Sequence, residues 1–294
     1  MSKILVTGST GLVGSQLVKD LVENKYEVYS CYHNAKPKYG ISIQMDISEE
    51  EEIIRVLEKI KPDIIIHLAA FTDVEKCEIQ KEQADILNTR ATEFLVKESE
   101  KNDSFFIYVS TDYVFDGNEE LRKENDIPNP INHYGKSKLE AEEIVKKYSS
   151  KFLIIRTSTP FGIHSNKKSF PLWVKENLEQ KNEIHVVTDQ YTSPTYVPNL
   201  SRMMINTIEN KVTGIINLVG ATKISRFEFA KMIAEKFKLD SSLIKPTKIK
   251  EIKWNAARPK DSSLDSSKAE EILDEKPQKI DQSLNEFQQL LKNI

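Results

Sequence analysis

The fold of this chain is decided by the segment Ile4-Leu5-Val6-Thr7-Gly8-Ser9-Thr10-Gly11-Leu12-Val13-Gly14. Its apolar residues predict a short strand, and a GxxGxxG turn then leads into a helix. A helix amino end presents unpaired N–H groups, and glycines let a pyrophosphate approach that backbone. The pattern predicts a dinucleotide site on Gly8, Thr10, Gly11, Leu12 and Val13. The alternative is a tight turn that needs glycine only for its dihedral angles.

Beyond this segment, short apolar runs alternate with longer amphipathic stretches, which is typical of βαβ units. The runs at 64–66 and 105–107 are apolar on both faces, as a parallel sheet covered by helices requires. We therefore expect an α/β fold with a Rossmann-type doubly wound parallel sheet. Strands are expected at Lys3–Val6, Glu27–Cys31, Ser42–Gln44, Asp63–Leu68, Phe105–Val109 and Phe152–Arg156. Helices are expected near Leu12–Asn24, Glu49–Lys59, Glu78–Glu100 and His133–Tyr148.

The rhythm changes after Arg156, where Pro, Ser and Asn become more frequent. Further strands are expected at Ile184–Val187 and Ile215–Val219, and helices near Val197–Ile208 and Phe227–Phe237. We interpret this part as a smaller C-terminal substrate-binding region interleaved with the first. The expected dinucleotide-binding domain covers 1–158, joined by about 188–212, and the substrate-binding region covers 159–187 and 213–294.

Composition narrows the class of protein. The chain has 294 residues, a net charge of −3 and 30% charged residues of both signs, so no basic field favours nucleic acid as a partner. No segment approaches the ~20 apolar residues of a membrane span, so no membrane partner is expected. Cys31 and Cys77 lack CxxC or histidine-rich company, which predicts neither disulfide nor metal site and favours a reducing, cytoplasmic compartment.

The second expected strand ends where a ribose-reading carboxylate belongs, about 20 residues past the glycines. His33 and Asn34 stand there instead, which favours NADPH over NADH because no carboxylate repels a 2′-phosphate. The alternative is a solvated polar loop. Asp46, followed by Ile47, is placed to accept a hydrogen bond from an adenine amino group, or else to begin the next helix.

The strand ending at His67-Leu68 is followed by Ala69-Ala70-Phe71-Thr72. Small alanines there allow a nicotinamide ribose to approach closely. Ligands of parallel sheets bind beyond the carboxyl ends of the strands, so this loop and Thr111 are expected to face one crevice. We therefore assign Leu68, Ala69, Ala70 and Thr72 to the dinucleotide site. His67 lies inside an apolar run and is expected to be a core histidine.

Tyr134 and Lys138 lie at i and i+4 of the helix expected at His133–Tyr148, so both side chains reach one pocket. The spacing alone is common by coincidence, but Thr111 ends the preceding strand. An adjacent ammonium should lower the phenol's pKa from ~10, so that Tyr134 can protonate a carbonyl oxygen. Thr111 is expected to donate a hydrogen bond to that oxygen, and Lys138 to hold the nicotinamide ribose. These three residues are the predicted catalytic groups.

The chain resembles an extended short-chain dehydrogenase/reductase and, within that group, the dTDP-4-dehydrorhamnose reductase family. The resemblance covers almost the whole chain. It rests on the glycine turn, Ala69-Ala70-x-Thr72-x-Val74-Glu75-x-x-Glu78, Asn88, Ser110-Thr111-Asp112-Tyr113-Val114-Phe115-Asp116-Gly117, Tyr134-Gly135-Lys136-Ser137-Lys138, Asp189-Gln190-x-x-Ser193-Pro194-Thr195 and Arg258-Pro259. The middle and late motifs are far more specific than the glycine turn.

This resemblance implies NAD(P)H-dependent reduction of the 4-keto group of a nucleotide-linked 6-deoxyhexose, giving dTDP-L-rhamnose. Thr111, Tyr134 and Lys138 match the family's catalytic triad, and Asn88 matches an asparagine near that lysine, which adds it to the cofactor site. Thr72, Thr111 and Asp112 are assigned to the substrate. Arg258, a fixed cation beside a proline, suits a sugar-nucleotide diphosphate, the alternative being a surface ion pair.

Several alternatives stay open at this point. The tryptophan that rhamnose enzymes tend to carry after Arg-Thr-Ser is replaced here by Thr159, which leaves the hexose undecided. The regulatory subunit of methionine adenosyltransferase, which binds NADP, is similar in the same motifs. A reductase of another nucleotide-linked keto sugar is a third reading. Family analogy implies a homodimer and allows Mg2+ at a subunit contact, although no acidic cluster in the sequence identifies a magnesium site.

Overall fold

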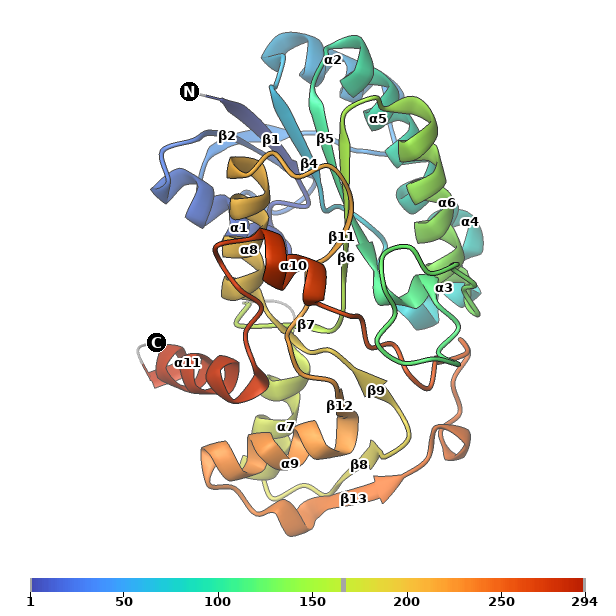
Figure 1. Cartoon of the computed structure of the whole chain (residues 1–294), viewed down its shortest axis with the longest axis vertical. Helices are drawn as coiled ribbons and strands as arrows, with labels where there is room; N and C mark the ends of the chain where they lie inside the picture. Colours follow the sequence, from blue (N-terminus) through green and yellow to red (C-terminus); the bar gives the residue numbers. More distant parts are fainter. Residues whose placement is uncertain (1, 165–167, 293–294) are drawn as a thin grey trace.

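The molecule is built around a seven-stranded parallel sheet (Figure 1). The computed structural model describes residues 2–164 and 168–292. The strand order is β11-β6-β5-β4-β1-β2-β3, in which the chain reverses direction across the sheet between β1 and β4. The strands are β1 (Lys3–Thr7), β2 (Glu27–Tyr32), β3 (Ile41–Gln44), β4 (Ile64–His67), β5 (Phe105–Thr111), β6 (Phe152–Thr157) and β11 (Gly214–Asn217). This confirms the predicted α/β, Rossmann-type fold.

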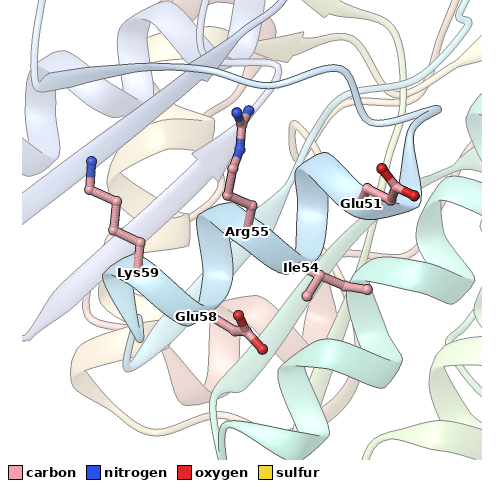
Figure 2. A pocket seen from close by; sticks show the side chains of 5 residues that line it. All are labelled: Glu51, Ile54, Arg55, Glu58 and Lys59. Atoms are coloured by element: carbon pink, nitrogen blue, oxygen red, sulfur yellow. The ribbon is translucent and has the colours of Figure 1, made fainter.

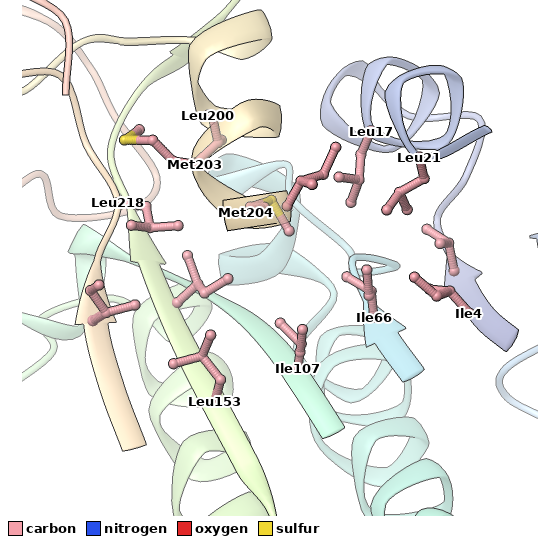
Figure 3. Packing of buried hydrophobic residues seen from close by; sticks show 14 of the residues in the cluster. Ile4, Leu17, Leu21, Ile66, Ile107, Leu153, Leu200, Met203, Met204 and Leu218 are labelled. Carbon is pink, nitrogen blue, oxygen red and sulfur yellow. The ribbon is translucent and has the colours of Figure 1, made fainter. Parts of the chain in front are cut away.

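Helices cover both faces of the sheet, which is why its central strands are apolar throughout. One face carries α1 (Leu12–Glu23), α8 (Val197–Glu209) and the short α10 (Ser267–Ile272); the other carries α2 (Glu50–Ile60), α5 (Ala91–Lys101) and α6 (His133–Tyr148). Figure 3 shows the first face, where Leu17 and Leu21 of α1 lie over Ile66 and Met203 of α8 lies over Leu218. These side chains are at most 1% exposed, so close packing holds the helices in place on the sheet.

The segment between β4 and β5 differs from the single helix predicted at Glu78–Glu100. It consists of α3 (Val74–Ile79), α4 (Lys81–Ala84), a π-helical stretch (Asp85–Arg90) and α5. The start is earlier because the Asp73 side chain accepts a hydrogen bond from the Lys76 amide and so caps α3. Gln80 then leaves helical geometry, with φ −111° and ψ 59°, and separates α3 from α4. The hydrophobic periodicity of the sequence indicates neither the earlier helix start nor the break at Gln80.

The C-terminal elements gather at one end of the molecule (Figure 1). They include α7 (Phe170–Glu179), α9 (Arg226–Phe237) and α11 (Ile280–Lys292). Short 3-10 turns also occur, one directly after β5 at Asp112–Val114 and others at Ser241–Leu243 and Ile249–Glu251. Short strands pair as β7 (Pro160–Phe161) with β10 (Thr195–Tyr196), β9 (Tyr191–Thr192) with β12 (Ile224–Ser225), and β8 (Ile184–Val187) with β13 (Ile244–Thr247). Phe161, Phe229 and Phe287 meet edge to face at the centre of a separate apolar cluster.

Strand β11 lies where the sequence did not place it. The predicted division assigns residues 213–294 to the substrate-binding region, yet β11 pairs in parallel with β6 and completes the main sheet. Its apolar side chains, such as Ile216, pack under α8 in the same cluster as Leu153 of β6. The predicted division also includes residues 1, 165–167, 293 and 294, which lie outside the described part of the chain.

Two smaller findings bear on the setting of the protein. Among residues 2–164 and 168–292, no helix combines the length and apolar character that crossing a bilayer demands. Cys31 and Cys77 are both buried and unpaired, as the sequence predicts.

Candidate active site

A cavity of about 840 Å³ opens at the carboxyl ends of β1, β2, β4, β5 and β6. It is where ligands of an open parallel sheet are expected to bind, beside the reversal of strand order. Seventeen of the predicted site residues line it: Gly8, Thr10, Gly11, Leu12, Val13, His33, Asn34, Asp46, Ile47, Leu68, Ala69, Ala70, Thr72, Thr111, Asp112, Tyr134 and Lys138. Residues from six separate segments of the sequence therefore meet at one crevice.

The glycine turn forms one side of this cavity, which we call the glycine-turn side (Gly8–Val13, His33 and Asp46). Gly8 has φ +66°, and a Cβ there would lie 2.7 Å from the Ala69 amide nitrogen. A Cβ on Gly14 would lie 2.1 Å from the Gly8 carbonyl oxygen, so glycine is required for the turn and helix to touch. Gly11 brings no capping side chain to α1, so its first N–H groups face the cavity. The geometry suits a pyrophosphate and also satisfies the turn interpretation.

Farther along this side, the ends of β2 and β3 present His33 and Asp46. The His33 Nδ1 lies 3.0 Å from the Asp46 carboxylate. Burial acts to raise the pKa of Asp46, but hydrogen bonds from Ser48 and the neighbouring His33 outweigh it and leave the pKa below its usual range. Asn34 and Ile47 line the same part of the cavity. Asp46 is thus ionised at neutral pH, as an acceptor for an amino group must be.

The loop after β4 lies against the glycine turn. The Ala69 amide donates to the Thr7 hydroxyl at 3.2 Å, and the backbone of Leu68 and Ala69 occupies the space that a Cβ on Gly8 would need. His67 bonds to Thr7 at 2.7 Å and to Thr92 at 3.1 Å and is 1% exposed. Burial lowers the His67 pKa to about 3. It is a neutral core histidine, as predicted.

Lys138 extends from α6 beneath the end of β5. Its Nζ donates to the Val109 carbonyl at 2.7 Å and lies 4.1 Å from the centre of the Tyr108 ring. Burial lowers the Lys138 pKa to about 7, against the opposing effect of Glu142 one turn along the helix. The amine therefore exchanges its proton near neutral pH, unlike an ordinary lysine.

Tyr134 lies one turn before Lys138 on α6, where Asn132 caps the helix by accepting from the Gly135 amide at 2.8 Å. The sequence predicts a phenol whose pKa is lowered by the ammonium, but the structure reverses the direction. Burial raises the Tyr134 pKa above its usual range, while a hydrogen bond with Thr111 acts to lower it. The phenol consequently keeps its proton at neutral pH and is a weaker acid than a free tyrosine.

The Thr111 hydroxyl is already engaged by its neighbours. It donates to the Asp112 carboxylate at 2.9 Å and accepts from the Tyr113 amide at 3.2 Å. Asp112 also accepts from the Ser158 hydroxyl at 2.7 Å, and burial raises its pKa although these hydrogen bonds oppose the rise. Asp112 thus orients Thr111, and Thr111 must turn its proton away from that carboxylate to donate to a substrate.

Two predicted site residues do not line the cavity. Asn88, in the π-helical stretch, accepts from the Phe71 amide at 2.7 Å and donates to the Ser137 hydroxyl at 3.0 Å. It therefore ties the loop after β4 to α6 rather than facing Lys138. Arg258 pairs with Glu75 at 2.7 Å and lies 4.7 Å from the centre of the Trp254 ring. The ion-pair alternative describes what its guanidinium does in this structure.

The opposite side of the cavity contains residues that sequence reasoning missed. We call it the Arg226 side; it is lined by Asp112, Thr159, Phe170 and Arg226. Arg226 is the first residue of α9, directly after the capping box formed by Ser225 and Glu228. The S-x-x-E pattern was a readable signal for the helix start, but nothing local connects residue 226 to residue 112.

The other depressions carry no such chemistry. Figure 2 shows a shallow one on α2, lined by Glu51, Ile54, Arg55, Glu58 and Lys59. All five side chains come from one helix, and none lines the large cavity. In the described part of the chain, no group of three or more His, Cys, Asp or Glu residues is arranged to hold a metal, so the Mg2+ that family analogy allows finds no ligand set there.

Comparison with known proteins agrees with this geometry. The family described as RmlD substrate binding domain matches residues 2–293. The chain belongs to this family. Its resemblance to the dTDP-4-dehydrorhamnose reductases is thereby confirmed over the full length.

Individual relatives are similar to this chain over most of its length. Probable low-salt glycan biosynthesis reductase Agl14 of Haloferax volcanii is 33% identical over 90% of each chain. The dTDP-4-dehydrorhamnose reductase of Aggregatibacter actinomycetemcomitans is 30% identical over 100% of this chain and 98% of its own. Methionine adenosyltransferase 2 subunit beta of Danio rerio is 31% identical over 91% of this chain and 84% of its own.

Solved structures extend the comparison. That of dTDP-4-dehydrorhamnose reductase from Bacillus anthracis in complex with NADP has a TM-score of 0.89 at 30% identity and covers 98% of this chain and 99% of that one. A hypothetical dTDP-4-dehydrorhamnose reductase from Sulfolobus tokodaii has a TM-score of 0.85 at 38% identity, covering 93% and 95%. The chain is a dTDP-4-dehydrorhamnose reductase-like oxidoreductase.

Proposed function

We propose that this chain reduces the 4-keto group of a nucleotide-activated 6-deoxyhexose, with dTDP-4-dehydrorhamnose as the substrate and dTDP-L-rhamnose as the product. The observation that carries the proposal is the convergence of Thr111, Tyr134 and Lys138 on one cavity with the glycine turn. A proton donor, a cation and a hydroxyl beside a dinucleotide cradle are the groups that carbonyl reduction requires.

The cofactor proposed is NADPH, with NADH as the second choice. The cradle fits it: a Cβ on Gly8 or Gly14 would strike backbone, and no carboxylate follows β2, where His33 and Asn34 stand. Ser110 and Thr157 add two buried hydroxyls without a hydrogen-bond partner among the described residues. The Bacillus anthracis relative is bound to NADP. When bound, NADPH supplies the hydride that reaches the carbonyl carbon.

The residues of the chain supply the remaining steps. Tyr134 holds its proton at neutral pH and gives it to the carbonyl oxygen as that oxygen gains charge. Lys138, anchored to the Val109 carbonyl, offers its remaining N–H donors to the ribose of the nicotinamide. Thr111 turns from Asp112 toward the substrate oxygen and stabilises its developing charge. The ketone becomes an alcohol with one hydride and one proton added.

Further contacts with the nucleotide sugar are assigned to Thr72, Asp112 and Arg258. Thr72 and Asp112 line the cavity beside the triad. Arg258 does not line the cavity, and it must release Glu75 before it can bind the diphosphate of the substrate. Asn88 remains proposed as a support of the cofactor site through Phe71.

The test is turnover by the full chain with a panel of nucleotide-linked 4-keto sugars, followed as loss of nicotinamide absorbance. We expect dTDP-4-dehydrorhamnose to be reduced faster than its epimers and faster than the corresponding sugars on other nucleotides. The proposal fails if no keto sugar oxidises NADPH although the protein demonstrably binds that cofactor. A different preferred sugar would keep the reaction type and replace the substrate.

A second candidate is a regulatory subunit of a methionine adenosyltransferase that binds NADP. The Danio rerio beta subunit favours it, since its identity to this chain, 31%, is close to the 30% of the Aggregatibacter actinomycetemcomitans reductase. The full chain, mixed with a methionine adenosyltransferase, would then co-elute with it and change its activity. We expect neither result, because a partner protein has no need of a buried Tyr134 and Lys138 arranged around Thr111.

We propose that the chain forms a homodimer in a reducing, cytoplasmic compartment. Family analogy supports a homodimer, and the two unpaired buried thiols, Cys31 and Cys77, support a reducing cytoplasmic compartment. The division into a dinucleotide-binding domain and a substrate-binding region is kept as a proposal, with β11 moved to the former. Light scattering of the purified chain tests the assembly.

A further inference from the structure

We infer that Arg226 binds an oxyanion of the substrate and so sets which nucleotide sugar enters. This inference rests on the proposed function and deepens it, because it concerns the same cavity. The oxyanion is either the diphosphate that links nucleoside to sugar or a carboxylate on the sugar itself. Both present the paired oxygens that a guanidinium fork binds bidentately.

Two other basic side chains that line the cavity lie beside a carboxylate: Lys168 pairs with Glu176, and the His33 Nδ1 lies 3.0 Å from the Asp46 carboxylate. Arg226 differs from both. Its Nη2 donates to the Thr159 hydroxyl at 3.2 Å, and within the described residues no carboxylate lies at ion-pair distance from it. A neutral hydroxyl does not balance the charge of the guanidinium, and Asp112 acts on it only from farther away.

Contacts with neighbouring residues hold both the backbone and the side chain of Arg226 in place. Its backbone amide donates to the Gln190 carbonyl at 2.9 Å, which fixes the start of α9. Its guanidinium carbon lies 5.1 Å from the centre of the Phe170 ring, and that ring stacks on Trp173 with centroids 5.9 Å apart. An arginine clamped on an aromatic face loses little conformational entropy when it binds an anion.

The position of Arg226 in the cavity indicates which anion it binds. Arg226 lines the cavity with Asp112 and Thr159, on the side of the catalytic threonine, and its charge is felt at Asp112 and at Arg258. The cofactor's pyrophosphate belongs on the opposite side, at the amino end of α1. Asp112 acts on the guanidinium only from beyond ion-pair distance, and its oxygens accept hydrogen bonds from Thr111 and Ser158 instead. The anion that completes Arg226 is therefore carried by the substrate.

The contrast with Arg258 supports this assignment. Arg258 was the arginine expected at the diphosphate, and it is paired with Glu75 outside the lining of the cavity. Arg226 faces the cavity and has no such partner within the described residues. Of the two, Arg226 can bind a phosphate or a carboxylate without first breaking an ion pair.

The experiment compares Arg226→Gln and Arg226→Lys with the parent chain, and uses Arg55→Gln on the exposed face of α2 as the matched control (Figure 2). Loss of a charge-assisted hydrogen bond pair predicts a KM for the keto sugar raised roughly 10- to 100-fold in Arg226→Gln, with partial rescue by lysine. The dissociation constant of NADPH should stay within about twofold, since the pyrophosphate site lies elsewhere. Arg55→Gln should change neither value.

Calorimetric titration with dTDP, which carries the diphosphate but no sugar, separates the two sources and does not depend on turnover. If the diphosphate is the anion, Arg226→Gln weakens dTDP binding by the same factor as it raises KM. If a sugar carboxylate is the anion, dTDP binding is unchanged, and the parent chain favours a nucleotide-linked 4-keto uronic acid in a manner that the variant loses; this outcome keeps the proposed reaction type but replaces the 6-deoxyhexose as the substrate. Either result supports the inference.

The inference is overturned if a folded Arg226→Gln protein binds dTDP and keto sugars, with and without a carboxylate, as the parent does. It is also overturned if the parent binds none of these ligands. Failure of the proposed function looks different: the parent then binds dTDP through Arg226 yet reduces no keto sugar. Thermal unfolding of each variant shows whether it is folded.

Discussion

The two sides of the cavity are built in different ways. The glycine-turn side is made of backbone and small side chains at consecutive positions, in which Gly8 with φ +66° and Gly14 with no room for a Cβ fix the turn. The Arg226 side is made of long side chains from residues as distant as 112, 159, 170 and 226. The first construction holds a ligand through geometry, and the second through charge. We therefore expect substitutions on the two sides to have different effects on stability, cofactor binding and turnover.

The largest effect is expected where the two sides meet, at Tyr134. Tyr134→Phe removes the proton donor and should lower kcat by about 10²–10⁴ while leaving NADPH binding unchanged. Single-turnover oxidation of NADPH and a separate measurement of the NADPH dissociation constant check the two halves of the statement. Tyr39→Phe, on an exposed side chain, is the control. A kcat close to the parent value would remove Tyr134 from the chemistry.

The next effect tests the claim that the glycine-turn side depends on backbone fit. Gly8→Ala forces a side chain into a left-handed conformation and against Ala69, and should cost roughly 2–5 kcal/mol of unfolding free energy together with NADPH affinity. Gly214 is the matched control, because it also has a positive φ, +85°, but nothing lies within 4 Å of its Cβ position. Gly214→Ala should cost only about 1–2 kcal/mol.

Denaturant unfolding measures both values. Equal losses for the two alanine variants would mean that the conformation, and not the close approach of the turn to Ala69, is what glycine supplies at position 8.

A third prediction concerns the pH dependence of stability at Lys138. Its pKa is lowered to about 7 by burial, with Glu142 opposing and the uncharged Tyr108 and Tyr134 as its other neighbours. Between pH ~7 and ~10.4 the unfolded chain holds this proton more than the folded one, so stability should rise with pH through that window. Lys138→Met lacks the proton. The stability advantage of Lys138→Met over the parent should therefore shrink by on the order of 2 kcal/mol between pH ~6 and ~9.

Thermal melts of both proteins across this range test the claim. A difference that does not vary with pH would show that Lys138 keeps an ordinary pKa in the folded protein.

How much the sequence could predict follows the same contrast between the two sides. The turn at Gly8–Gly14, the helix His133–Tyr148 and the meeting of Thr111, Tyr134 and Lys138 at one cavity were predictable, because each rests on a contiguous motif or on a helical period. Arg226 was not, because its meeting with Asp112 is created by the packing of α9 and not by spacing along the chain. Arg258 was placed at the diphosphate from residue type alone, which could not reveal Glu75 beside it.

The direction of the Tyr134 pKa was missed for a related reason. A lysine is visible in the sequence at i+4, whereas the burial that raises the Tyr134 pKa depends on the whole fold. The helix predicted at Glu78–Glu100 likewise contains a π-helical stretch whose Asn88 bonds to Phe71 and Ser137 in other segments, and no local pattern reveals these contacts.

The smallest predicted effect sharpens the description of the glycine-turn side at its ribose end. Asn34 lines the cavity next to His33, whose partner is Asp46. Asn34→Asp adds a carboxylate where dinucleotide folds that bind NAD carry one, and should raise the KM for NADPH about 3- to 10-fold while that for NADH changes little. Lys36→Gln removes a charge from the same exposed loop outside the cavity and should leave the ratio of the two nearly unchanged. If Asn34→Asp leaves NADPH favoured to the same degree, the 2′-phosphate does not lie beside Asn34.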